Sequence, residues 1–234
     1  MVAVAVVVPM SLGIPLSCPS TEPTMRVYRW VESLPPGSLV WFGYDGWASS
    51  VAEVGPSAVV VARHLLSRGC RLVVTSTIPD GSLLARKYVG RVAEAMGKKY
   101  GVDYVILGYR AGDMKAIRQM GAGLHGAYRT DVNGTPLAQL PILRGVGDAR
   151  SFAGIFTATD NKTFEWYAIV VKSQYGVPVY GASTAVGVPE LYSYYNAGQI
   201  SGLLAGLRGA AEYETLRNDP GNAEAGMLAQ SSVH

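Results

Sequence analysis

The sequence predicts an α/β domain in which a mostly parallel sheet of about five strands carries helices on both faces. From Thr24 onward, short apolar runs alternate with longer segments of helical periodicity, and this alternation is typical of a parallel sheet. The chain has 234 residues, of which 49% are apolar, which is enough for one substantial core. The tripeptide Tyr-Gly-Val occurs at 100 and again at 175, each time just before a predicted strand.

The first half of the chain predicts alternating helices and strands that end at proline or glycine. Pro35 and Pro36 end the first helix, because proline cannot continue one. Pro56 suits the first position of the next helix, and Gly69 suits the position after its end. The predicted elements are helix 24–34, strand 38–44, helix 56–68, strand 71–75, helix 82–100 and strand 103–107.

The second half continues the alternation after a long glycine-rich stretch. Asp113 is suited to cap a short helix that ends at Met120, and Asp160 is suited to cap another. Residues 121–150 hold many glycines and are expected to be irregular. The remaining predicted elements are strand 152–158, a helix from 160, strand 178–181 and a helical region over 189–207.

The chain divides into an apolar N-terminal segment, 1–23, a single α/β domain, 24–216, and a polar tail, 217–234. Residues 2–16 carry no charge, yet Pro9 and Pro15 are unfavourable in a membrane-spanning helix. Three interpretations stay open: a short membrane anchor, a strand that pairs with a neighbouring subunit, and a strand within its own domain. The first of these predicts a membrane-associated or extracytoplasmic protein.

Polar side chains follow every predicted strand. Because ligands of open parallel sheets bind beyond the carboxyl ends of the strands, these side chains are candidates for holding a small anion or a polar ligand. Caps of helices and tight turns use the same residue types, so a purely structural role is the alternative. The candidate ligand-binding residues are Asp45, Thr75, Ser76, Tyr109, Asp160, Ser183 and Thr184.

Several kinds of site are excluded by their missing motifs. The chain has no GxGxxG, GxxxxGK[ST] or GxSxG sequence, and its two cysteines and three histidines match no zinc spacing. We therefore predict no cofactor and assign no metal ligands, although convergence of Asp45, Asp160 and Asp80 on Mg²⁺ is an open alternative. A net charge of +3 without any basic block argues against a nucleic-acid partner.

Two segments predict self-association into a homo-oligomer. Only 16% of the residues are charged, against roughly 25% in an average domain, so much of the surface is neutral. The valines of the uncharged N-terminal segment require cover, and glycines spaced by four within 189–207 form a small-residue stripe if that region is helical. The candidate assembly residues are Val4, Val6, Val8, Gly198, Gly202 and Gly206.

The chain resembles a family of functionally uncharacterised prokaryotic proteins that are usually membrane-anchored. The segments that carry the resemblance are Leu-Pro-Pro-Gly-Ser at 34–38, Tyr44-Asp45, 104–109, Tyr-Gly-Val-Pro at 175–178, 201–207 and 209–213. The resemblance implies a Rossmann-like or flavodoxin-like domain held near a membrane, and it implies no particular reaction.

Taken together, these features predict a non-enzymatic α/β subunit that self-associates through its N-terminal segment and its C-terminal small-residue helix. The alternative is a small-ligand-binding protein or a metal-dependent hydrolase. In that case the site lies at the carboxyl ends of the strands, with Asp45 as its central carboxylate.

Overall fold

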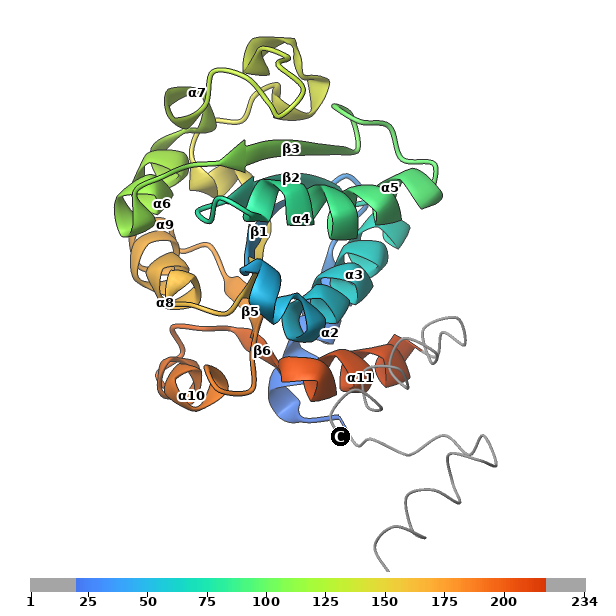
Figure 1. The fold of residues 1–234 in the computed structure, drawn as a ribbon, viewed down its shortest axis with the longest axis vertical. Helices are drawn as coiled ribbons and strands as arrows, with labels where there is room; N and C mark the ends of the chain where they lie inside the picture. The colour runs from blue at the N-terminus through green and yellow to red at the C-terminus, as the bar shows by residue number, and fades with distance from the viewer. Residues whose placement is uncertain (1–19, 218–234) are drawn as a thin grey trace, which may run out of the picture.

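The computed structural model describes residues 20–217, and in them six parallel strands form one sheet (Figure 1). The strand order is β3-β2-β1-β4-β5-β6, which is the order of the Rossmann fold. The predicted fold class is confirmed, with one strand more than expected. The strands are β1 (Leu39–Asp45), β2 (Arg71–Ser76), β3 (Tyr104–Tyr109), β4 (Gly154–Thr159), β5 (Val179–Ser183) and β6 (Gly202–Ala205).

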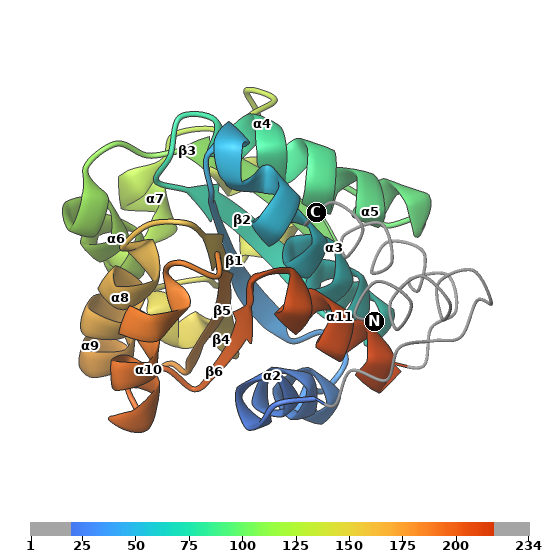
Figure 2. The ribbon, with the colours of Figure 1, turned by 60° about the horizontal axis from the view of Figure 1, so that its bottom comes forward.

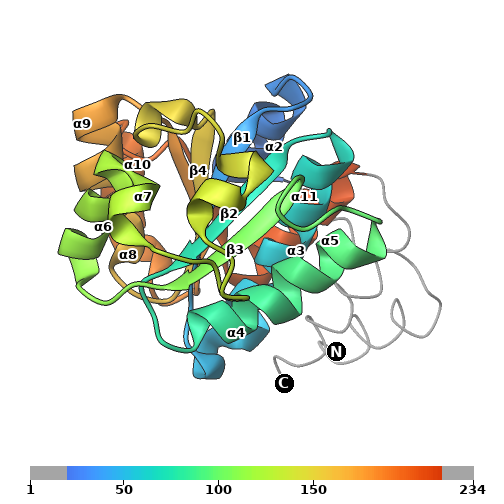
Figure 3. The same cartoon turned by 90° about the horizontal axis from the view of Figure 1, so that it is seen from above.

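Helices cover both faces of the sheet, as predicted (Figure 3). Alternate residues of β1 point to opposite faces, so Phe42 packs with α2, α3 and α4 while Trp41 packs with α6 and α8. Every residue of β1 is buried, which is why this strand is a continuous apolar run. The helices are α2 (Glu22–Ser33), α3 (Val51–Ser67), α4 (Gly81–Ala85), α5 (Arg91–Ala95), α6 (Asp113–Ala122), α7 (Leu124–Ala127), α8 (Thr163–Tyr167), α9 (Ser173–Tyr175), α10 (Val188–Asn196) and α11 (Gly206–Arg217).

Shorter turns complete the helical layers. The π-helical turns η2 (Arg86–Gly90) and η6 (Ala168–Lys172) join α4 to α5 and α8 to α9. Much of the glycine-rich stretch is irregular, but it also contains α7 and three 3₁₀ turns. The 3₁₀ turns of the domain are η1 (Ala48–Ser50), η3 (Leu137–Gln139), η4 (Pro141–Leu143) and η5 (Ala149–Ser151).

The prediction of one helix over 189–207 is wrong. Helix α10 ends at Asn196, and the next residues turn back into β6 before α11 begins. Gly198 and Gly206 have φ angles of 72° and 53° in this turn and at the start of α11, whereas Gly202 begins the strand. The three glycines therefore share no helix face. The sequence did not reveal this, because a short run of small apolar residues fits a buried strand as well as a helix.

Three predicted helix starts are also wrong. Asp113, the predicted cap, is itself the first residue of α6, whose N-cap is Gly112, and no side chain within residues 20–217 caps that helix. Helix α3 begins at Val51, so Pro56 lies inside it and removes one hydrogen bond near its N-terminus. Helix α8 is preceded by Asn161, whose side-chain oxygen accepts a hydrogen bond from the Thr163 amide at 2.8 Å. Asp160 instead accepts a hydrogen bond from the Trp47 amide, at 3.3 Å.

Helix α2 packs beside strand β6 and helix α11, at one edge of the sheet (Figure 2). Helix α2 packs on β6, where Gly202 lies so close to Val27 that a side chain there has no room. Thr21 donates hydrogen bonds to the Glu212 carboxylate from its amide, at 2.9 Å, and from its hydroxyl, at 2.7 Å. Segments from both ends of the described chain thus hold the β6 edge.

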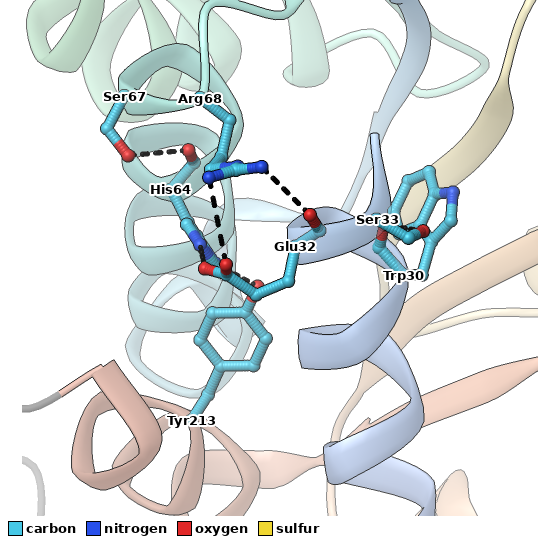
Figure 4. A network of polar contacts seen from close by, with 7 residues as sticks. All are labelled: Trp30, Glu32, Ser33, His64, Ser67, Arg68 and Tyr213. Carbon is cyan, nitrogen blue, oxygen red and sulfur yellow. Dashed lines mark hydrogen bonds and ion pairs between the residues drawn. The ribbon is translucent and has the colours of Figure 1, made fainter. Parts of the chain in front are cut away.

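A buried histidine joins three of these helices (Figure 4). His64 on α3 lies 2.7 Å from Glu32 on α2 through its Nε2 and 2.8 Å from the Tyr213 hydroxyl on α11 through its Nδ1. Burial lowers the pKa of His64, although the hydrogen bond to Glu32 opposes that shift. A neutral ring satisfies both contacts, with Nε2–H donating to Glu32 and the Tyr213 hydroxyl donating to Nδ1.

We expect Tyr213→Phe to lower the free energy of unfolding by about 1–3 kcal/mol at pH 8, because it leaves the buried Nδ1 without a donor. Urea unfolding measures the change. Tyr28→Phe is the matched control, since Tyr28 contacts the same rings, and we expect a change below about 0.5 kcal/mol. Equal effects of the two substitutions would contradict the assigned hydrogen bond.

The same histidine gives the stability a pH dependence of known sign. Because the pKa of His64 is lower in the folded state, the unfolded chain binds more protons once the pH falls to about 6.5, the ordinary pKa of histidine. The contribution of His64 to the free energy of unfolding is therefore complete above pH 6.5 and is lost as the pH falls toward the folded-state pKa.

None of the helices within residues 20–217 combines the length and the apolar character that a bilayer-spanning helix requires. Val4, Val6 and Val8, and with them the predicted apolar segment 2–16, lie outside the described residues.

Candidate functional site

The order in which successive strands are added to the sheet reverses between β1 and β4. Strand β1 pairs with β2 on one side and with β4 on the other. The connections from β1 to β2 and from β2 to β3 cover one face of the sheet, and those from β3 to β4 and from β4 to β5 cover the other. Ligands of this fold class bind outside the carboxyl ends of the strands at such a switch point. Asp45 is the last residue of β1 and lies opposite Thr159, the last residue of β4. The candidate site is therefore built around these two strand ends.

Asp45 is a completely buried carboxylate with three donors. Its Oδ1 accepts hydrogen bonds from the amide and the hydroxyl of Thr77, at 2.6 and 2.9 Å, and its Oδ2 accepts one from the Thr157 hydroxyl at 3.1 Å. Burial raises the pKa of Asp45 to about 6, and the Thr77 and Thr157 hydrogen bonds only partly offset that rise. The carboxylate therefore titrates near neutral pH, which is unusual for aspartate.

A tyrosine from α8 completes this group. Tyr167 is completely buried, and its hydroxyl makes no hydrogen bond within the described part of the chain. Burial and the nearby charge of Asp45 raise the pKa of Tyr167 well above its ordinary value. Next to it, the Trp41 indole N–H donates to the Thr75 hydroxyl at 2.7 Å. We call this group the Asp45 cluster; its members are Trp41, Gly43, Asp45, Thr75, Thr77, Thr157 and Tyr167.

The Asp45 cluster occupies space that a side chain at position 43 would fill, so Gly43 is required there. A Cβ atom at position 43 would lie 2.7 Å from Asp45 Oδ2, 2.9 Å from Thr157 Oγ1 and 3.0 Å from the Tyr167 hydroxyl. All three oxygens thus converge on the α-carbon of Gly43, and any side chain there would displace them. The glycine that ends the apolar part of β1 is therefore required by the polar cluster above it.

The surface above the cluster is formed by loops that Asp45 connects. The Asn161 side-chain amide donates to the backbone oxygen of Asp45 at 2.7 Å, which ties the β4–α8 loop to the end of β1. Thr77 ties the β2–α4 loop to the same residue. Glu53, in the first turn of α3, accepts a hydrogen bond from the Ala185 amide at 2.9 Å. We call the exposed parts of these loops the switch-point surface; its residues are Trp47, Glu53, Asp160, Asn161, Ala185 and Val186.

Charge on the switch-point surface is acidic. In this fold class an anionic group usually binds at the N-terminus of the helix after the first strand. Here Glu53 lies at that position on α3, and Asp160 lies in the neighbouring loop. A phosphate at this place would be repelled by both carboxylates. The surface therefore suits an uncharged polar or a cationic molecule, rather than the small anion that the sequence also allowed.

The other predicted ligand-binding residues do not join Asp45 and Thr75. The Ser76 hydroxyl exchanges hydrogen bonds with Ile78 and closes the β2–α4 turn, which is the structural role that the sequence left open. Ser183 and Thr184 are buried where β5 ends, and Tyr109 is exposed on the edge strand β3. Within residues 20–217, no three His, Cys, Asp or Glu side chains gather as a metal site, so Asp45, Asp160 and Asp80 form no magnesium site.

Three members of the Asp45 cluster were not among the predicted ligand-binding residues, namely Thr77, Thr157 and Tyr167, although the first two are strand-end hydroxyl groups of the kind that the prediction considered. A signal existed for Tyr167, because it lies three residues after Phe164 and four before Val171, on the predicted apolar face of that helix. Thr157 shares a strand face with Ile155, since alternate residues of a strand point the same way. No periodicity applies to Thr77, which lies in a loop.

The chain was also compared with known proteins. No family model matches it, and no curated protein matches it closely enough to count as a relative. The resemblance to membrane-anchored prokaryotic proteins therefore stays a prediction, and the functional argument depends on the geometry of the site.

Proposed function

We propose that the domain binds a small molecule, uncharged and polar or cationic, at the switch-point surface. The observation that carries the proposal is the position of Asp45 at the switch point of the sheet. Its buried carboxylate accepts hydrogen bonds from Thr77 and Thr157, and its backbone oxygen holds the β4–α8 loop through Asn161. Asp45 has no exposed surface, so it is a positioning residue and does not touch the ligand. Proteins keep costly buried charges where function requires them, at the expense of stability.

The chemistry of the surface supports this choice of ligand. Trp47 is 44% exposed, and its backbone amide donates a hydrogen bond to the Asp160 carboxylate, so an aromatic residue and an acidic residue are neighbours on this surface. An aromatic ring next to carboxylates attracts cationic groups, and carboxylate oxygens accept hydrogen bonds from hydroxyl groups. Amines, amino acids and sugars are the classes that carry such groups.

A thermal-shift screen of the full-length protein tests the proposal. The compounds screened are amines, amino acids, sugars and nucleosides, all of which lack a phosphate group. A ligand at a hundred times its Kd should stabilise the protein by about 2.7 kcal/mol. We expect Trp47→Ala to weaken the binding at least tenfold, whereas Val102→Ala, an exposed apolar residue just before β3 at the opposite edge, should leave it unchanged. A screen without any stabilising compound would refute the proposal, as would equal affinities of the two variants.

A second proposal, self-association, is favoured by exposed apolar side chains at the same edge. Leu83, in α4, is 71% exposed, and Val186, after β5, is 89% exposed. Large apolar side chains exposed to this degree often belong to contacts between subunits. We propose a second copy of this chain as the partner, together with the N-terminal Val4, Val6 and Val8.

Size-exclusion chromatography with light scattering measures the association. We expect the full-length protein to form a dimer or a larger oligomer, and the Leu83→Glu/Val186→Glu variant to be a monomer. The Val4→Asp/Val6→Asp/Val8→Asp variant tests the contribution of the N-terminal segment separately. A monomeric natural protein would overturn the second proposal and leave the ligand proposal intact.

A further inference from the structure

A cavity of about 460 Å³ lies far from the switch-point surface, between α2 and the amino ends of the last two strands. Its walls come from Arg26, Arg29 and Ser33 on α2, and from Ser201 just before β6. Trp30 and Tyr180, the second residue of β5, also line it. The volume falls in the range of small-molecule sites. Because it opens at the amino ends of the strands, it is distinct from the site described above.

The cavity is positively charged. Two guanidinium groups line it, and none of its lining residues is acidic. Arg26 and Arg29 lie 3.2 and 3.4 Å from one and the same oxygen of Glu22, so one carboxylate is shared by two cations. Each guanidinium has five N–H donors, and a single shared oxygen satisfies few of them. Arg29 also makes a long contact from Nη2 to the Met25 sulfur, at 3.8 Å. The planar arrangement of guanidinium donors matches the oxygens of phosphate.

The floor of the cavity is rigid and aromatic. The rings of Trp30 and Tyr180 are stacked, with centroids 4.2 Å apart and planes inclined by 12°. Arg26 lies 5.1 Å from the centroid of the Tyr195 ring, which holds the guanidinium in place. Trp30 is only 7% exposed, and its indole N–H has no acceptor among the described residues. Figure 4 shows Trp30 together with Ser33 on this helix.

We propose that this cavity binds a phosphate group carried by a small organic molecule or by a lipid headgroup. The paired guanidinium groups hold the phosphate oxygens, while the organic part contacts the aromatic rings. The Ser33 hydroxyl donates its proton to the Trp30 backbone oxygen at 2.7 Å, so its oxygen serves the ligand as an acceptor. The volume is much larger than phosphate alone needs, which is why an organic moiety is included. Helix α2 begins at Glu22, with five residues between it and the uncharged segment 2–16, so a headgroup is as suitable a source as a free metabolite.

Isothermal titration with glycerol 3-phosphate, and sedimentation with vesicles of phosphatidylcholine with or without phosphatidylglycerol, test the proposal on the full chain. The test variant is Arg26→Gln/Arg29→Gln. The matched control is Arg91→Gln/Arg118→Gln, which removes the same charge from exposed positions on α5 and α6. We expect the test variant to weaken binding at least tenfold and the control to stay within twofold. Because Arg26 and Arg29 are mostly exposed, the test variant should fold normally, which its circular dichroism verifies.

The two probes separate the two sources. Arginine-dependent binding of glycerol 3-phosphate supports a free phosphorylated molecule, whereas arginine-dependent binding of phosphatidylglycerol vesicles alone supports a lipid headgroup. Absence of both kinds of binding would overturn the proposal. An equal loss in the control variant would also overturn it, because the effect would then be one of net charge.

Discussion

At pH 7.5, Asp45→Asn is expected to raise the free energy of unfolding by about 3 kcal/mol. Burial raises the pKa of Asp45 from 3.8 in the unfolded chain to about 6, and this shift corresponds to about 3 kcal/mol of destabilisation once the carboxylate is charged. An asparagine oxygen still accepts both hydrogen bonds from Thr77, and its amide donates to the Thr157 hydroxyl. The substitution removes the buried charge and keeps the contacts.

The effect has a defined pH window. The folded protein keeps the Asp45 proton up to about pH 6, whereas the unfolded chain releases it near pH 3.8. The stabilising contribution of this group is therefore complete below pH 3.8 and is lost as the pH rises through 6. Urea unfolding of both proteins at pH 4, 5, 6 and 7.5 should show a difference that grows from nearly zero to about 3 kcal/mol. A difference that is constant with pH would disprove the assignment.

Thr77→Val is the companion variant. It keeps the carboxylate and the backbone hydrogen bond but removes the hydroxyl donor, which lowers the pKa of Asp45 in the natural protein. We therefore expect the loss of stability to extend to a higher pH than in the natural protein. Asp45→Asn removes the pH-dependent loss of stability, whereas Thr77→Val extends it to higher pH. These opposite effects distinguish a titrating Asp45 from a general effect of substitutions in the cluster.

Gly181→Ala is expected to destabilise the protein by about 3 kcal/mol, at the upper end of the range for overpacking. A Cβ atom there would lie 2.5 Å from the backbone oxygen of Thr157 and 2.8 Å from ring carbons of Phe164. The first is fixed in β4 and the second is a fully buried side chain of α8, so neither can move away easily. The new methyl group therefore pushes β5 and α8 apart beside the Asp45 cluster.

Gly126→Ala is the matched control for this substitution. Gly126 lies in α7, and no atom comes within 4 Å of the Cβ position there. Alanine favours helix over glycine, so we expect a gain of up to about 1 kcal/mol. Urea unfolding of both variants measures the contrast. If Gly181→Ala cost no more than Gly126→Ala, the close packing of β5 on β4 would be disproved.

Most of the sheet could be predicted because its strands are buried on both faces. The run Val40-Trp41-Phe42 has no polar residue to place on a solvent face, so its extent alone marks β1. Strand β6 was missed because Leu203 and Leu204 lie between glycines at helical spacing, and only pairing with β5 decides between strand and helix. That pairing is a long-range contact, which a local pattern does not contain.

The site could be predicted only in part. Asp45 and Thr75 follow strands, and the topology of a parallel sheet brings strand ends to one edge. Which neighbours they meet depends on the faces of β1 and β2 and on how α8 lies against them. Asn161, rather than Asp160, provides the side-chain oxygen near the start of α8, and this leaves Asp160 at the surface next to Trp47.

The hydrogen bonds from Thr21 to Glu212 join the start of the described chain to its last helix, and this long-range contact affects biosynthesis. On the ribosome, α2 is made early, but the strand and the helix that it packs against are among the last segments to emerge. Until then the edge of β5 has no neighbour, and an open edge can pair with other nascent chains. A chain stalled before β6 should therefore depend on chaperones to stay in solution, whereas in the completed chain β6 pairs with the edge of β5.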